Sequence, residues 1–269
     1  MRCGGAAAPI FSASYNGSLH TLAQSVDVVL VAPRNPLNIG AAARAMANFG
    51  FAHLTVAAPY APHWREAKSA VGAPQVLADA RETGTLAEAV AQCTFIAGTG
   101  TLVHRRPEQE VLQLPALAPR MLNAIAKGGR AALVFGPEKH GLTRDDLSYC
   151  HVLVEIPTDP RQPSMNMGQA VAVCLYELCR SADTLSRPND IQSIGDAGHR
   201  LVDSAALERL GELIEETLSA ADYSPEVMRN ANRHDLRLLL RRLNLSAQDT
   251  RRILGIFRRI LWRLHRGAP

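Results

Sequence analysis

The segment at residues 133–142 combines residue types that suit ligand binding. An apolar run, Leu133–Phe135, gives way to the sequence GPEKHG at residues 136–141, so two glycines and one carboxylate follow a buried-strand pattern. Glycine lets the backbone approach a ligand closely, and backbone N–H and C=O groups can then recognise the edge of a nucleobase without side chains. The sequence therefore predicts a binding loop at the end of a strand.

Two further segments have a similar character. Residues 156–168 read IPTDPRQPSMNMG and lead directly into an apolar helical pattern, so Ser164 and Asn166 lie beside a predicted helix start. Taken singly, either of these residues is better explained as an N-cap than as a catalytic residue. Residues 35–44 read NPLNIGAAAR, in which Arg44 is the one long charged group on a turn of small residues. We expect Asn38 and Arg44 to face the same cleft at the strand ends.

In order and spacing, the three segments resemble the motif set of the SpoU/TrmH branch of the SPOUT methyltransferases, which methylate ribose 2′-hydroxyls of RNA with S-adenosylmethionine. The resemblance covers Val26 to about Arg180 and departs from the common pattern at Met165, where leucine is usual. It implies a catalytic set of Arg44, Asn38, Glu138, Ser164 and Asn166. It also implies a pocket for S-adenosylmethionine lined by Thr99, Gly100, Thr101, Gly136, Glu138, Gly141, Ile156, Ser164, Met165 and Asn166.

The chemistry of their side chains indicates the roles of Arg44 and Glu138. Arginine is a poor general base because its pKa exceeds about 12. We therefore interpret Arg44 as a group that orients the 2′-hydroxyl and a neighbouring phosphate, and we leave the proton acceptor open. Glu138 is expected to anchor loops, or Arg44 itself, through charge-assisted hydrogen bonds.

Short apolar runs alternate with helical patterns along the first two thirds of the chain. This alternation predicts an α/β fold with a mainly parallel sheet covered by helices on both faces. We expect strands at 26–31, 53–57, 94–98, 130–135 and 152–156, and helices at 39–49, 85–92, 114–126 and 167–179. The family resemblance further implies a trefoil knot around Val152–Cys179 and a homodimer.

Composition excludes several classes of protein. The five cysteines show no C-x-x-C spacing, which favours a reducing, cytoplasmic compartment. No apolar run is long enough for a membrane span, and the first residues lack the apolar core of a signal peptide. The nine histidines show no paired metal spacing, so we expect no metal, and the common phosphate-loop and dinucleotide-binding motifs are absent from the sequence.

The domain organisation follows from changes in composition. Residues 1–25 are expected to form a disordered tail, residues 26–182 the methyltransferase domain, residues 183–203 a polar linker and residues 204–269 a small all-α domain. In this last part, helices are expected at 204–220, 226–243 and 247–265, with Ser224 and Pro225 at the start of the second.

Positive charge is concentrated near the C-terminus. The range 229–266 contains eleven arginines and two acidic residues, a net charge of +9 in a chain whose total is +4. On a projection of the last helix the arginines occupy one arc and the aliphatic residues the other. A solvated polar face would look the same, but an arginine face without lysine favours nucleic acid. The predicted RNA contacts are Arg105, Arg106, Arg252, Arg259, Arg263 and Arg266.

The helical C-terminal part also resembles that of the TrmJ type, a subfamily that methylates cytidine or uridine at nucleotide 32 of the tRNA anticodon loop. The resemblance thus implies RNA, and tRNA in particular, as the partner. Two alternatives stay open at this point. The chain could be a ribose methyltransferase of ribosomal RNA, or a non-catalytic RNA-binding protein that uses the same fold.

Overall fold

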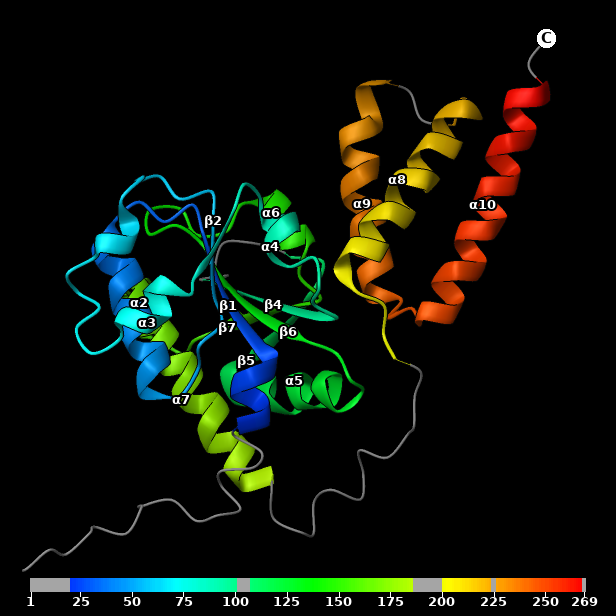
Figure 1. Ribbon diagram of the computed structural model, residues 1–269. Helices are drawn as coiled ribbons and strands as arrows, with labels where there is room; N and C mark the ends of the chain where they lie inside the picture. The colour runs from blue at the N-terminus through cyan, green and yellow to red at the C-terminus, as the bar shows by residue number, and fades with distance from the viewer. Residues whose placement is uncertain (1–19, 101–106, 186–199, 224–225, 268–269) are drawn as a thin grey trace, which may run out of the picture.

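The computed structural model describes residues 20–100, 107–185, 200–223 and 226–267 (Figure 1). Seven strands form one sheet in the order β3-β2-β1-β6-β4-β7-β5, and every neighbouring pair is parallel. The strands are β1 (Val26–Val31), β2 (Leu54–Ala57), β3 (Arg81–Thr83), β4 (Phe95–Thr99), β5 (Glu110–Gln113), β6 (Ala131–Phe135) and β7 (Val152–Glu155). The predicted parallel α/β fold is confirmed.

Successive residues of the central strands pack into two separate cores. Val28 and Leu30 of β1 enter one hydrophobic cluster, whereas Val29 and Val31 enter the other. A strand buried on both faces needs apolar residues at every position, which explains its continuous apolar sequence. The edge strands β3 and β5 are largely exposed, and their polar sequences RET and EVLQ gave no such pattern.

Helices cover both faces of the sheet (Figure 1). The cluster that contains Leu30 is closed by α2 (Pro36–Asn48), α3 (Pro74–Ala78), α5 (Leu117–Ala126) and α7 (Met167–Leu185), and by the 3-10 turns η1 (Trp64–Glu66) and η2 (Leu114–Ala116). The other face is covered by the short helices α4 (Leu86–Ala89) and α6 (Arg144–Ser148). The trefoil knot that the resemblance implies stays a prediction.

The sheet unit includes residues before Val26. Residues 20–25 are helical, and Leu22 is fully buried in the core against the sheet. Buried apolar contacts stabilise this turn, so residues 20–25 do not belong to the disordered tail expected over residues 1–25; residues 1–19 lie outside the described part. At the other boundary, α7 continues to Leu185, beyond the expected start of the linker.

Three helices form a second unit with its own core. They are α8 (Ser204–Ala220), α9 (Arg229–Arg242) and α10 (Ala247–Gly267), with the turn η4 (Glu226–Met228) before α9. Leu207, Leu210 and Leu240 are buried between them. Ser224 and Pro225, the expected helix start, lie outside the described residues. Across the described ranges, no helix combines the length and apolar character that crossing a membrane requires.

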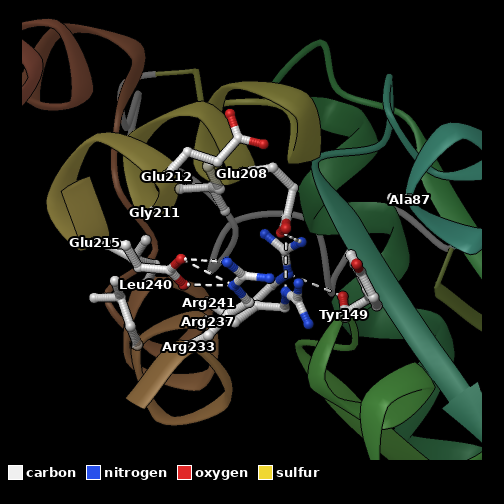
Figure 2. Close-up of a pocket in the computed structure, with 12 residues that line it drawn as sticks. Ala87, Tyr149, Glu208, Gly211, Glu212, Glu215, Arg233, Arg237, Leu240 and Arg241 are labelled. Carbon is white, nitrogen blue, oxygen red and sulfur yellow. Dashed lines mark hydrogen bonds and ion pairs between the residues drawn. The ribbon is translucent and has the colours of Figure 1, made fainter. Parts of the chain in front are cut away.

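Arg237 of α9 joins this helical unit to the sheet unit (Figure 2). Its Nη1 donates to Ser148 Oγ at 2.9 Å and lies 3.0 Å from Asp145 Oδ1, so it reaches α6. Its guanidinium lies over the Tyr149 ring, 4.1 Å from the centroid, while Nε donates to Glu208 Oε2 of α8 at 3.1 Å. One side chain therefore contacts both units.

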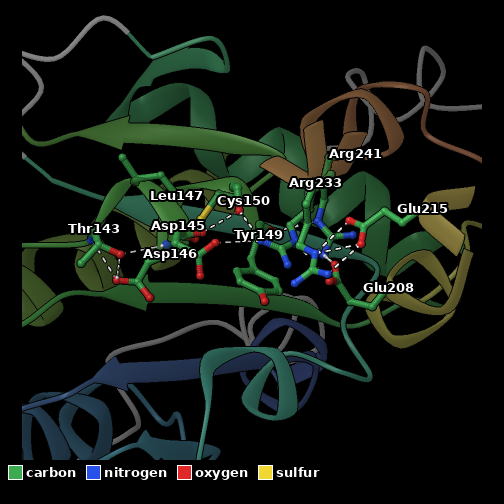
Figure 3. Close-up of polar contacts among 12 residues, drawn as sticks. Thr143, Asp145, Asp146, Leu147, Tyr149, Cys150, Glu208, Glu215, Arg233 and Arg241 are labelled. Carbon is green, nitrogen blue, oxygen red and sulfur yellow. Dashed lines mark hydrogen bonds and ion pairs between the residues drawn. The ribbon is translucent and has the colours of Figure 1, made fainter. Parts of the chain in front are cut away.

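Arg241 lies almost fully buried at the same junction (Figure 3). It donates from Nε to Tyr149 O at 2.9 Å, and from Nη2 to Ser204 Oγ at 2.8 Å and Glu208 Oε1 at 2.9 Å. Breaking a buried pair of this kind leaves an uncompensated charge, which is strongly destabilising. The helical unit is therefore fixed beside α6, the helix that follows the 136–142 loop.

The free energy of unfolding is expected to fall as the pH drops below 6.5, because His151 is held neutral in the fold. Its Nδ1 accepts a hydrogen bond from Ile96 N at 3.1 Å, and its ring stacks on Phe95. Burial, followed by the charge of Arg241, lowers the pKa of His151 from 6.5 to about 3. The unfolded chain thus takes up a proton at a higher pH than the folded chain, so this stabilisation is complete above pH 6.5 and is lost as the pH falls towards 3.

The expected loss is at most about 1.4 kcal/mol per pH unit in this window. Urea unfolding between about pH 7 and pH 5 measures it, in a range where most carboxylates stay ionised. The matched variant His151→Asn keeps a hydrogen-bond acceptor but takes up no proton, so its unfolding free energy should depend less on pH. Identical pH dependence in both proteins would rule out His151 as the cause.

Candidate active site

The segments at residues 133–142 and 156–168 meet at the carboxyl ends of β6 and β7 and, with Thr99 and Gly100 at the end of β4, surround a cavity of about 290 Å³. The segment at residues 35–44 follows β1 and contributes none of the residues that line this cavity. Ligands of parallel α/β sheets bind at this edge, because the loops that follow the strands converge there. Eight of the residues predicted to bind the cofactor line the cavity: Thr99, Gly100, Gly136, Glu138, Gly141, Ile156, Ser164 and Met165.

A chain of hydrogen bonds joins the three segments. Asn166 Nδ2 donates to Asn38 Oδ1 at 2.9 Å, and Asn38 Nδ2 donates to Glu138 Oε1 at 2.7 Å. Asn38 therefore uses both ends of its amide, one towards each of the other loops. The arrangement fixes the relative positions of loops that come from three distant parts of the sequence.

Glu138 receives further hydrogen bonds from the start of α2. Its Oε2 accepts from Arg34 N at 3.3 Å, and its Oε1 accepts from Asn35 N at 3.4 Å. Burial alone would raise the pKa of Glu138, but the hydrogen bonds from Asn38 and from these backbone groups outweigh it and hold the pKa below its usual range. The carboxylate thus stays ionised at the cavity wall, and it anchors the loops rather than Arg44.

Asn166 also begins α7. Its Oδ1 accepts from Gly168 N at 2.9 Å and from Gln169 N at 3.4 Å, as an N-capping side chain does. The capping role and the site role are therefore both present in one residue. Gly168 lets this helix start approach α2, because a Cβ there would lie 2.6 Å from that of Ala41.

The 136–142 loop depends on its two glycines for its own shape. A Cβ on Gly136 would lie 2.2 Å from Leu142 N, so the tight contact is with the loop itself rather than with a ligand. Gly141 has a φ of 64°, in the left-handed region that favours glycine. These two positions fold the loop back beside the cavity.

Arg44 does not join this group. It is exposed on α2, outside the residues that line the cavity. Six residues at about 100° each place Arg44 about 120° from Asn38 around the helix, and the expectation that both face the same cleft stays a prediction. Within the described part of the chain, no hydrogen bond or ion pair engages the Arg44 guanidinium, and it is free to meet a group from outside.

The remaining residues that the sequence predicted for the site lie in different surroundings. Thr99 donates its hydroxyl to Val134 O at 2.9 Å, so it ties β4 to β6 at the edge of the cavity. Ser164 lies exposed at the cavity rim. Thr101, Arg105 and Arg106 lie outside the described residues.

Several cavity residues were not predicted individually. They lie in or beside the same loops and include apolar side chains that form much of the wall: Phe135, Pro137, Lys139, His140, Leu142, Leu147, Thr158, Pro163, Met167 and Ala170. In the sequence, the one indication that these residues line the cavity was their position close to the ends of the apolar strand patterns. The backbone N–H groups of Arg34 and Asn35 that hold Glu138 carried no such signal, because a backbone donor leaves no mark in the sequence.

One group of potential metal ligands lies elsewhere in the described chain. Glu108, His234 and Asp235 bring one ligand atom each to within 4.8 Å of one another. The two carboxylates are exposed to solvent. That the protein functions without a metal ion therefore stays a prediction.

Comparison with known proteins agrees with this geometry. The SpoU rRNA methylase family matches residues 25–176. The tRNA (cytidine/uridine/adenosine-2′-O-)-methyltransferase TrmJ of Pseudomonas aeruginosa is 40% identical over 159 residues, which cover 57% of this chain and 60% of that protein. The tRNA (cytidine/uridine-2′-O-)-methyltransferase TrmJ of Salmonella typhimurium is 32% identical over 238 residues, which cover 87% of this chain and 95% of that protein.

A solved structure extends the similarity to three dimensions. The crystal structure of TrmJ from Z. mobilis ZM4 has a TM-score of 0.74 at 28% sequence identity, and the match covers 87% of this chain and 98% of that chain. The family match spans the sheet unit, and the longer matches extend beyond it. With its three motif loops joined by hydrogen bonds beside one cavity, this chain belongs to the SpoU methylase family.

Proposed function

We propose that this protein transfers a methyl group from S-adenosylmethionine to a ribose 2′-hydroxyl of tRNA, at nucleotide 32 of the anticodon loop. The observation that carries the proposal is the hydrogen-bonded chain Asn166–Asn38–Glu138, which joins three loops beside a cavity at the strand ends. Such fixed positioning supplies much of the rate in a transfer between two bound groups.

The cavity suits S-adenosylmethionine. Its volume of about 290 Å³ is close to the lower end of the range for small-molecule sites. Loop backbone and apolar side chains such as Leu142 and Met167 suit an adenine ring, while the ionised Glu138 and the hydroxyls of Thr99 and Ser164 offer polar contacts. When bound, S-adenosylmethionine supplies an electrophilic methyl group. The residues of this chain hold it and orient the acceptor.

Arg44 is proposed to orient the 2′-hydroxyl and a neighbouring phosphate. Because it lies outside the cavity of its own chain, it reaches the acceptor in one of two ways. Either the bound RNA spans the distance from the cavity to α2, or a homodimer brings Arg44 of a second copy to the cavity. The homodimer and the trefoil knot, both implied by the family, are part of this proposal.

The helical unit favours tRNA over ribosomal RNA. The family match ends at residue 176, whereas the match to the Salmonella tRNA methyltransferase covers 87% of this chain. Similarity thus extends beyond the catalytic unit into the helices, where a substrate-specific contact would lie. We further propose a division into a methyltransferase domain, which includes residues 20–25 and extends to Leu185, and a basic helical domain over residues 204–269, joined by a linker. Buried free thiols such as Cys93 and Cys174 support a reducing cytoplasm as the compartment.

The proposal is tested by incubating the protein with labelled S-adenosylmethionine and, separately, with tRNA and ribosomal RNA that lack the modification. We expect label in tRNA alone. Label in ribosomal RNA alone would favour the rRNA methyltransferase. An absence of label in both, together with retained RNA binding, would favour the non-catalytic alternative.

The arginines of α10 provide a prediction about RNA binding. If Arg252, Arg259, Arg263 and Arg266 contact phosphates, replacing all four by glutamine should weaken tRNA binding and flatten its salt dependence. On a duplex, the slope of log K against log[salt] should shrink by up to about 0.9 per lost contact. Titration of tRNA at several salt concentrations measures this slope.

Two controls accompany the titration. The affinity for S-adenosylmethionine should stay unchanged, because the arginines lie on a different unit from the cavity. Light scattering should show the same oligomeric state. A slope equal to that of the wild type would exclude these arginines from the RNA contact and confine the RNA site to the sheet unit.

A further inference from the structure

Trp262 occupies an unusual place on α10. With about 100° per residue, it projects about 20° from Arg251, inside the arc of arginines and away from the apolar face. On the other side of the helix, Phe257 packs against the core of the helical unit and Leu261 is buried. Trp262 is 38% exposed, whereas Trp64, the other tryptophan of the chain, is fully buried. Packing of the helix does not account for a large aromatic side chain at this position.

Two arginines stack on this indole ring. The guanidinium carbon of Arg259, one turn before Trp262, lies 4.2 Å from the ring centroid, and that of Arg266, one turn after, lies 4.2 Å from it as well. Both arginines are exposed. The three side chains thus form one surface in which an aromatic ring lies between two cationic groups.

The surface has little negative charge of its own. Within the described part of the chain, Arg258, Arg259, Arg263 and Arg266 have no acidic side chain within salt-bridge distance. Among the described residues, Arg252 is the one arginine of α10 that approaches a carboxylate, that of Asp249, at 3.8 Å. Unpaired guanidinium groups around an aromatic ring suit a partner that offers both phosphates and flat rings.

We propose that Trp262, Arg259 and Arg266 form a binding site for one unpaired nucleotide of RNA. The base stacks on the indole ring, and the guanidinium groups contact the neighbouring phosphates. Stacking on an aromatic side chain is the common way in which proteins hold a base that lies outside a duplex. The proposal deepens the proposed function, on which it rests for the choice of tRNA as the source of the nucleotide.

Base stacking requires one guanidinium to leave the face of the ring. An exposed cation–π contact is weaker than stacking of a base on an aromatic ring, so the exchange is favourable. The displaced guanidinium keeps its charge and lies beside the phosphates of the same nucleotide. The arginines therefore keep the ring in place before RNA binds and contribute charge afterwards.

A second copy of the chain is the rival partner for this surface. Ile256 and Ile260 on the same helix are also exposed, at 57% and 42%, and could extend an apolar contact. However, the arginines that flank Trp262 would then face arginines of the other copy across a symmetric interface, and like charges oppose association. Charge complementarity therefore favours RNA.

The test uses the fluorescence of the full-length protein. Because Trp64 is buried, only Trp262 is accessible to a bound base. Titration with unmodified tRNA should quench the emission, whereas inorganic polyphosphate, which offers charge without bases, should leave it nearly unchanged. The variant Trp262→Phe retains an aromatic ring but loses the signal, and it should bind tRNA nearly as well as the wild type.

The variant Trp262→Ala should bind tRNA about 5- to 100-fold more weakly. Its salt slope should equal that of the wild type, because no charge is removed. The matched control Ile256→Ala removes a more exposed apolar side chain from the same helix and should keep full affinity. Light scattering of all three proteins reports their oligomeric state.

Two results obtained with Trp262→Ala would overturn the inference. One is unchanged tRNA affinity in Trp262→Ala, and the other is a shift of oligomeric state in that variant, which would identify the surface as a contact between copies. Methylation of tRNA by the wild type, measured in parallel, keeps the two proposals apart. If tRNA is methylated but does not quench the fluorescence of Trp262, only the proposed nucleotide site is refuted. If tRNA quenches the fluorescence but is not methylated, the nucleotide site is supported and the proposed function is refuted.

Discussion

Replacing Arg44 by alanine is expected to lower kcat for methyl transfer at least about 100-fold, a loss of about 2.7 kcal/mol in transition-state stabilisation. The side chain is exposed on α2 and has no partner in the described chain, so its removal should cost little stability. It also lies outside the cavity, so the affinity for S-adenosylmethionine should stay the same. Single-turnover kinetics, calorimetry and thermal unfolding measure the three quantities.

A matched control is available in the same unit. Arg120→Ala removes another exposed helical arginine, on α5, whose ion pair with Glu110 is of the surface type that contributes little. It should retain wild-type kcat. A kcat above about a tenth of wild type in Arg44→Ala, a loss below about 1.4 kcal/mol, would remove Arg44 from the catalytic set.

The same variant also identifies the chain on which Arg44 acts. In a homodimer, mixing Arg44→Ala with a variant that cannot bind the cofactor gives hybrids in which one of two sites combines an intact cavity with Arg44 of the other copy. If Arg44 acts across the interface, about a quarter of the wild-type activity should return after random exchange of subunits. No return of activity would place its action within one chain.

The second large effect is expected at Gly141. Replacing it with valine forces a β-branched residue to a φ of 64°, which is strained, and so reshapes the loop at the cavity wall. We expect the affinity for S-adenosylmethionine to fall at least about tenfold, the effect of about 1.4 kcal/mol. Calorimetric titration of the cofactor measures this loss.

Gly72 provides the control for backbone strain. Its φ is 81°, and, as at Gly141, a Cβ there meets nothing within 4 Å. It lies before α3, away from the cavity. Gly72→Val should therefore lose stability but keep its cofactor affinity. Equal affinities in Gly141→Val and the wild type would remove this glycine from the cofactor site.

The sequence predicted the parts of the fold that burial imposes on it. A central strand such as β6 is apolar at every position because both faces are covered, and this pattern was readable. The edge strand β5 pairs with one neighbour and is mostly exposed, so its sequence is that of a loop. The strands that were missed are therefore the ones that packing constrains least.

The site was predictable in its members but not in its connections. Asn38 is separated from Glu138 by 100 residues and from Asn166 by 128, and only the fold brings the three amide and carboxyl groups together. Arg44 is a different case. Helix geometry alone separates it from Asn38, and the shared motif gave no information about which surface each residue faces.

The position of Trp262 on the arginine face of α10 follows from the sequence alone. A projection that sorted arginines from aliphatic residues left it unassigned, although it lies within the arginine arc. The structure adds what the projection lacks, which is the stacking of Arg259 and Arg266 on the ring. A large aromatic residue on a charged helical face is itself informative.

The most direct test of the central claim is to locate the methyl group that the protein adds. After reaction of unmodified tRNA with S-adenosylmethionine, nuclease digestion and mass spectrometry of the fragments distinguish a methylated ribose from a methylated base and give the position in the chain. The account predicts a 2′-O-methylated ribose at nucleotide 32, absent when Arg44→Ala replaces the wild type. A methyl group on a base, or no methylated nucleotide in tRNA at all, would contradict it.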